Sequence, residues 1–143
     1  MQLITGTRPH PLDPLAASEI DAARRVLAEA GLLTETVRVA YLGLEEPPKD
    51  EVLAHGPGAP ITRRARAFLL DVTAGAAGDV IVNITAGRVE ERHPIDPLTD
   101  GQVPMLDEEH ERVREVLRAD AGWIEALRRR GVHDPASVWL AAL

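Results

Sequence analysis

The spacing of hydrophobic and polar residues changes several times along this 143-residue chain, and each change predicts a different element. Between Ser18 and Ala30 the apolar residues recur at intervals of three and four, as they do on one face of a helix. Ser18 and Asp21 have the spacing of a capping box, and Gly31 can terminate the helix. The pattern predicts one amphipathic helix with a single buried stripe.

Apolar and polar residues then alternate over residues 36–45, which is the period of a strand. This alternation places Val37, Val39 and Tyr41 on one face of the sheet. The strand should end at Pro47-Pro48, because proline has no backbone N–H to donate to a neighbouring strand.

Three further strands are predicted, after a Gly/Pro-rich loop over residues 49–60. The first covers residues 62–72. The other two lie within residues 79–93 and meet at Ala86-Gly87, since glycine accepts the positive φ of a tight hairpin. In the first strand of this hairpin we expect Val80, Val82 and Ile84 to face the helix. One helix packed across about four antiparallel strands is an α+β fold.

The remainder of the chain predicts two helices and a terminal strand. Residues 107–119 have a helical period, Gly122 interrupts it, and Gly131 ends the second helix. Residues 137–143 are rich in apolar and strand-forming types, and no later strand in this chain can pair with them. Natural proteins usually cover such an edge, so we expect a partner to cover it.

The pattern divides the chain into four parts. These are an arm over residues 1–9, an α+β domain over 10–93, a proline-rich linker over 94–104 and a helical segment with a strand over 105–143. At its start the linker region repeats the opening hexapeptide almost completely. The echo indicates either two related units in tandem or a chance recurrence of a proline-rich turn.

Residues that could perform catalysis are scarce. The chain has no cysteine, and its five histidines do not have the spacing of a copper or zinc site. No phosphate-binding glycine loop or Gly-x-Ser-x-Gly motif occurs. The acids at residues 107–109 suit the start of a helix, where they interact favourably with its dipole. We therefore predict no catalytic, cofactor-binding or metal-binding residue in this chain.

The charge balance argues against binding to nucleic acid. The net charge is −7, whereas nonspecific nucleic-acid binding needs clustered cations. The two basic runs, Arg63-Arg64 with Arg66 and residues 128–130, are interpreted as solvated faces. No apolar stretch reaches the length of a signal peptide or of a membrane span of about 18 residues, so we expect a soluble, cytoplasmic protein.

Several segments, in this order, resemble the amino-terminal, non-catalytic region of copper-containing quinone amine oxidases. They are His10-Pro11-Leu12-Asp13-Pro14-Leu15, Glu45-Glu46-Pro47-Pro48-Lys49, Ala67–Asp71, Val80–Val89, Leu117–Asp120 and Arg129–Pro135. The resemblance implies a cystatin-like domain, called N2, followed by the start of the next small domain, N3. The chain departs from the family at Ala16, where a capping Thr or Ser is expected.

The resemblance also indicates where the chemistry of the family would lie. In that family the quinone is made from the tyrosine of an Asn-Tyr-Asp/Glu motif, and copper is held by a His-x-His pair with a third histidine. Tyr41, the single tyrosine, lies between Ala40 and Leu42 and does not match. Copper and topaquinone are therefore expected on a partner and not in this chain.

We accordingly interpret the chain as the non-catalytic small subunit of a split primary amine oxidase, similar to tyramine oxidase. Its partner would be a separate catalytic large subunit that oxidises amines to aldehyde, ammonia and hydrogen peroxide. The predicted interface residues are Trp123, Val138, Trp139, Leu140 and Leu143. A stand-alone cystatin-like binding or regulatory module is the alternative, and an independent small-molecule enzyme is a third possibility for which no polar constellation was found.

Overall fold

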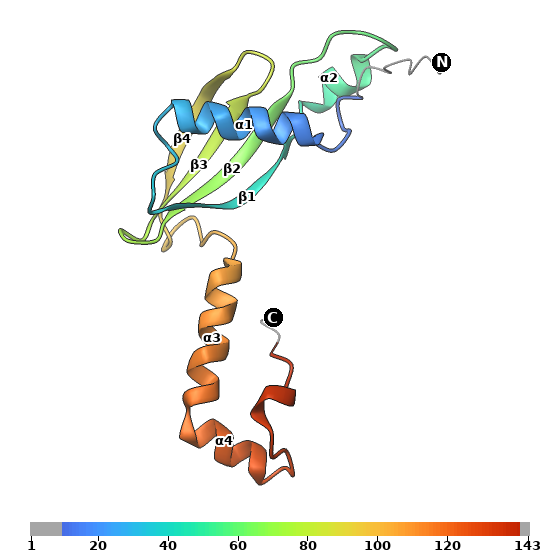
Figure 1. Cartoon of the computed structure of the whole chain (residues 1–143). Helices are drawn as coiled ribbons and strands as arrows, with labels where there is room; N and C mark the ends of the chain where they lie inside the picture. Colours follow the sequence, from blue (N-terminus) through green and yellow to red (C-terminus); the bar gives the residue numbers. More distant parts are fainter. Residues whose placement is uncertain (1–9, 141–143) are drawn as a thin grey trace, which may run out of the picture. The chain divides into compact units, whose positions relative to one another are not determined.

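The computed structural model describes residues 10–140 of the chain (Figure 1). The chain divides into two compact units, the first ending at Pro104 and the second beginning at Met105. Each unit is described by itself. In the described part, no helix combines the length and the apolar character needed to cross a membrane.

The first unit consists of a helix lying across one face of a four-stranded antiparallel sheet, which confirms the α+β prediction (Figure 1). The helix is α1 (Ala17–Glu29), and the strands follow one another as a meander in the order β1-β2-β3-β4. Their bounds are Val37–Glu45 for β1, Arg64–Asp71 for β2, Ala76–Asn83 for β3 and Arg88–Ile95 for β4.

The core lies between α1 and the two central strands. Its buried residues are Ala23 and Leu27 of α1, Ala65, Ala67 and Leu69 of β2, and Val80 and Val82 of β3. The alternate alanines of β2 leave room for the helix to approach the sheet. Val80 and Val82 face the helix as the strand period predicts, because successive side chains of a strand point to opposite faces.

The start of α1 differs from its prediction. The helix is capped at Ala16, whose N–H donates to the Glu19 carboxylate at 2.9 Å, whereas Ser18 lies inside the helix and is exposed. The predicted cap formed by Ser18 and Asp21 is wrong. Glu19 also binds a buried arginine from the sheet, so a tertiary contact stabilises this earlier start.

Strand β1 contains a bulge that changes which side chains face the helix. Its register with β2 shifts between Val39 and Tyr41, which leaves Ala40 as the extra residue. An extra residue reverses the alternation beyond it. Val37 and Leu42 therefore pack against the core, while Tyr41 contacts Phe68 with ring centroids 5.3 Å apart. The prediction that Val37 and Tyr41 share one face is wrong.

The predicted loop over residues 49–60 begins with a short helix, α2 (Lys49–Ala54). Pro48 precedes it, and Asp50 and Glu51 lie in its first turn, where acids stabilise the positive end of the helix dipole. The loop prediction is therefore wrong for the first half of this range. The β3–β4 hairpin turns through Gly87, which has a φ of +65°, as expected.

The repeated hexapeptide adopts two different structures. At its first occurrence, the Asp13 N–H donates to the His10 carbonyl, which closes a turn before α1. At its second occurrence, His93 and Pro94 belong to β4 and the turn begins only at Asp96. The echo in sequence therefore does not reflect a repeated structural unit.

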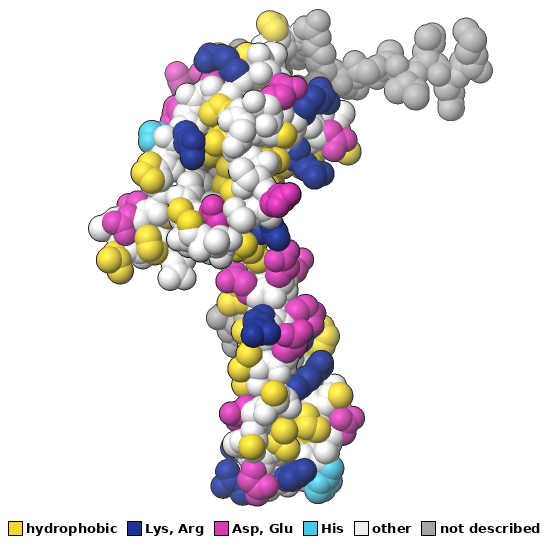
Figure 2. Space-filling view, turned by 60° about the vertical axis from the view of Figure 1, so that its left-hand side comes forward, with side chains coloured by type: hydrophobic (Ala, Val, Ile, Leu, Met, Phe, Trp, Pro, Cys, Tyr) yellow, Lys and Arg dark blue, Asp and Glu magenta, His cyan; other side chains and the backbone are white. Residues whose placement is uncertain are grey.

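The second unit consists of α3 (Asp107–Ala119), α4 (Ala121–Arg128) and a 3₁₀ turn, η1 (Pro135–Ser137). Both predicted helices are present, but they are separated at Asp120; the prediction that Gly122 interrupts the helical period is wrong, because Gly122 lies inside α4. Val138 is extended, with φ −88° and ψ 122°, but no strand of the described chain pairs with residues 138–140. None of the described residues of this unit is buried, and hydrophobic and charged side chains intermingle on the face seen in Figure 2.

Candidate functional site

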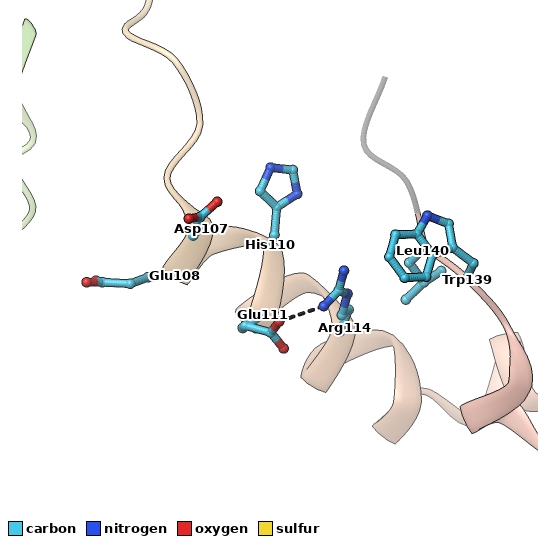
Figure 3. A pocket seen from close by; sticks show the side chains of 7 residues that line it. All are labelled: Asp107, Glu108, His110, Glu111, Arg114, Trp139 and Leu140. Atoms are coloured by element: carbon cyan, nitrogen blue, oxygen red, sulfur yellow. Dashed lines mark hydrogen bonds and ion pairs between the residues drawn. The ribbon is translucent and has the colours of Figure 1, made fainter. Parts of the chain in front are cut away.

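The start of α3 and the extended residues 138–140 enclose an open cleft of about 630 Å³ within the second unit (Figure 3). Its lining residues are Asp107, Glu108, His110, Glu111 and Arg114 of α3, with Trp139 and Leu140 opposite. Intervals of three and four residues place Asp107, His110, Glu111 and Arg114 near one another along the helix surface. We name this the α3 cleft.

Arg114 connects the two sides of the α3 cleft. Its guanidinium donates to the Glu111 carboxylate at 2.6 Å and lies 5.4 Å from the centroid of the Trp139 ring. A cation over an aromatic face is attracted by the electron density of the ring. The Trp139 residue remains 82% exposed despite this contact. A large aromatic side chain that is open to solvent is suited to anchoring a partner.

The predicted interface residues occupy different places. Trp139 and Leu140 line the α3 cleft, and Val138 is half-buried immediately before them. Trp123 is half-buried in α4 and is absent from the cleft lining; its backbone N–H donates to the Asp120 carboxylate at 2.6 Å. Leu143 lies outside the described residues. Contact of these residues with a partner stays a prediction.

The part of the cleft contributed by α3 was not predicted from the sequence. The acids at residues 107–109 were interpreted as residues that suit a helix start, and Arg114 was assigned no role. The helical spacing of the charged residues was a usable signal, because it places them on one face. Without the fold, nothing indicated that this face lies opposite Trp139.

A second hollow, of about 330 Å³, lies in the first unit beside two histidines. The rings of His10 and His55 meet edge to face, with centroids 5.6 Å apart. Nδ1 of His10 accepts from the Leu12 N–H at 3.2 Å. Across the part of the chain that the structure describes, no three His, Cys, Asp or Glu residues are grouped so that they could hold a metal ion.

Arg63 is buried, so its interpretation as part of a solvated face is wrong. The residue is 5% exposed. Its guanidinium donates to the backbone carbonyls of Pro11 at 3.1 Å and Asp13 at 2.9 Å, and to Glu19 at 2.7 Å. The hydrogen bond from Arg63 lowers the pKa of Glu19. Arg63 therefore fastens the turn that precedes α1 to the end of the sheet.

The other arginines of this run lie on the sheet face opposite α1, and both have acidic partners. Arg64 pairs with Glu90 at 2.6 Å, and Arg66 lies 3.2 Å from Asp79 and 3.5 Å from Glu45. Hydrogen bonds from Asn83 and Arg64 lower the pKa of Glu90. Acidic partners within the chain therefore neutralise the charges of Arg64 and Arg66.

Comparison with known proteins places the first unit within one family. The model of the AGAO-like N2 domain matches residues 16–92, which include α1 and most of the sheet. The histamine oxidase of Arthrobacter globiformis is 43% identical over 141 residues, which cover 99% of this chain and 20% of that protein.

Two further relatives agree with this match. The primary amine oxidase of Arthrobacter sp. (strain P1) is 32% identical over 86% of this chain and 18% of its own length. The primary amine oxidase of Klebsiella aerogenes is 26% identical over 92% of this chain and 17% of its own length. The chain thus spans about a fifth of the length of the curated relatives it matches.

Proposed function

Because the chain belongs to the AGAO-like N2 domain family and is homologous to the amino-terminal region of copper amine oxidases, we propose that it is the non-catalytic small subunit of a split amine oxidase. A separate large subunit would carry the catalytic domain. The observation that supports this proposal is the match to histamine oxidase, which runs through both units of this chain.

The proposed complex oxidises primary amines. An amine, dioxygen and water would yield an aldehyde, ammonia and hydrogen peroxide, with copper and topaquinone held by the large subunit. The relatives are named for oxidation of histamine, methylamine and primary amines, which supports this substrate class. The residues of this chain would supply binding surface to the complex and no reacting group.

The extended residues after Ser137 provide a means of association. Val138 has strand-like backbone angles, and residues 138–140 have no strand partner in the described chain. Addition of this segment to a sheet of the large subunit would satisfy its backbone groups and bury Trp139. The exposed indole would then contribute to affinity as an interface anchor.

Deletion of residues 138–143 tests this role. The tagged chain is purified from its native host at moderate salt, and copurifying proteins are identified by mass spectrometry. We expect a copper-containing oxidase chain with the intact protein and its loss with the deletion variant, while the far-UV circular dichroism of the first unit persists. Undiminished copurification after the deletion would refute this mode of association.

One observation favours a stand-alone binding module as a second candidate. The first unit has its own core between α1 and the sheet, including the fully buried Leu27, Val80 and Val82, so it can fold without a partner. Under this alternative the native purification would yield a homo-oligomer with no oxidase chain and no amine-dependent peroxide.

A further inference from the structure

The second unit lacks a core of its own. None of its described residues, 105–140, is buried, and Val113 and Val116 of α3 are 48% and 56% exposed. Short helices in water depend on burial of an apolar face for most of their stability. Units of this size rarely fold alone without a disulfide, a metal or a partner. The described residues of this unit therefore lack the burial that would keep it folded by itself.

The two walls of the α3 cleft differ in chemistry (Figure 3). The wall formed by α3 carries the carboxylates of Asp107 and Glu111 and the ring of His110, with Arg114 already bonded to Glu111. Glu108 also lines the cleft, but its side chain points away from Trp139. The opposite wall carries Trp139 and Leu140. A group that fills the cleft must therefore present positive charge to one wall and apolar surface to the other.

An extended polypeptide meets both requirements with a simple sequence pattern. Successive side chains of a strand point in opposite directions, so alternate residues would face the acidic wall and the apolar wall. Residues 138–140 lie beside the cleft and have no strand partner in the described chain, although the Val138 N–H donates to the Pro135 carbonyl.

We propose that the α3 cleft receives an extended segment of the catalytic large subunit in which lysine or arginine alternates with large apolar residues. This inference rests on the proposed function. The charge of the acidic wall favours a basic segment. The match to histamine oxidase includes this unit, and histamine oxidase is about five times as long as this chain. A second copy of the chain is a poorer occupant, because its net charge is −7.

The test measures binding of purified variants to the oxidase chain that copurifies with the wild-type protein. Trp139→Ala should weaken the affinity at least about tenfold. The double variant Asp107→Asn, Glu111→Gln should weaken it and reduce its dependence on salt, because two attractive charges are lost. Leu53→Ala and Asp50→Asn, at exposed positions of α2, serve as matched controls and should leave the affinity unchanged within about twofold.

A photo-crosslinking residue at position 139 identifies the occupant directly, even where an alanine variant folds poorly. We expect a crosslink to an oxidase peptide with alternating basic and apolar residues. A crosslink to a second copy of this chain or to a helical segment would overturn the inference, as would unchanged affinity in both cleft variants. If no oxidase chain binds the wild type, this inference and the proposed function are both contradicted. If an oxidase chain binds with the same affinity to the wild type and to both cleft variants, only this inference is contradicted.

Discussion

Arg63 shows how one side chain positions the start of the fold. Its guanidinium is buried and donates to carbonyls of the opening turn and to Glu19 at the start of α1. Those carbonyls belong to the proline-rich hexapeptide that precedes α1, so they lie outside the backbone hydrogen bonding of the helix. The buried cation satisfies them and thereby links the turn, the helix and the sheet.

Arg63→Met should lower the free energy of unfolding by about 2 to 3 kcal/mol, because it leaves Glu19 and the turn carbonyls without their donor. This loss is smaller than for a fully buried ion pair, because the Glu19 side chain retains 18% exposure. Urea denaturation measures the change. Arg25→Met, at an exposed position of α1, should change it by less than about 0.5 kcal/mol; an equal loss in both variants would contradict the role of Arg63.

Glu19 should give the fold a measurable pH dependence. The hydrogen bond from Arg63 lowers the pKa of Glu19 in the folded state. The stabilisation is complete above the unfolded pKa of about 4.3 and is lost as the pH falls through the lower folded value. Glu19→Gln should therefore reduce the loss of stability on acidification below about pH 5, whereas Glu29→Gln should not. Parallel pH profiles for wild type and Glu19→Gln would exclude this contribution.

The burial of Arg63 could not be predicted from the residues around it. Glu19 and Pro11 lie 44 and 52 positions away in sequence. Locally, Arg63 has the strand parity of Ala65 and Ala67, but no acid in the neighbouring sequence indicates a partner for a buried cation. The opening turn and Glu19, which meet Arg63 just before β2, supply its partners.

At the scale of elements, the sequence pattern predicted α1, which buries one face through Ala23 and Leu27, and the four antiparallel strands. The bulge at Ala40 was missed because the register of β1 depends on its pairing with β2. The short helix α2 was missed for a different reason. It is held by a preceding proline and acids in its first turn, and six residues are too few for an apolar period.

The two units should differ strongly in local stability. Backbone amides of β2 and β3, which carry most of the sheet's core residues, should exchange with solvent at least about a hundredfold more slowly than those of α3 in the isolated chain. The reason is that the second unit has no buried residue among those described. Hydrogen–deuterium exchange followed by mass spectrometry measures this, and equal protection of α3 and β3 would contradict it.

At the scale of the whole molecule, the chain combines a unit with its own core and a unit without one. The apolar residues near position 139 were predicted to form an interface, because no strand in the chain could pair with them, and they form one side of the α3 cleft. The sequence could not predict the other side, since the acids of α3 resemble any solvated helix start. The opposition of acidic and apolar walls arises only when α3 and residues 138–140 are brought together.

The most direct test of the central claim is amine-dependent formation of hydrogen peroxide by the protein purified from its native host. We expect peroxide from the eluate that contains both this chain and a copper-containing oxidase chain, and none after the two are separated and this chain is assayed alone. Peroxide formation by this chain alone, or an inactive eluate that holds only copies of this chain, would contradict its assignment as a non-catalytic subunit.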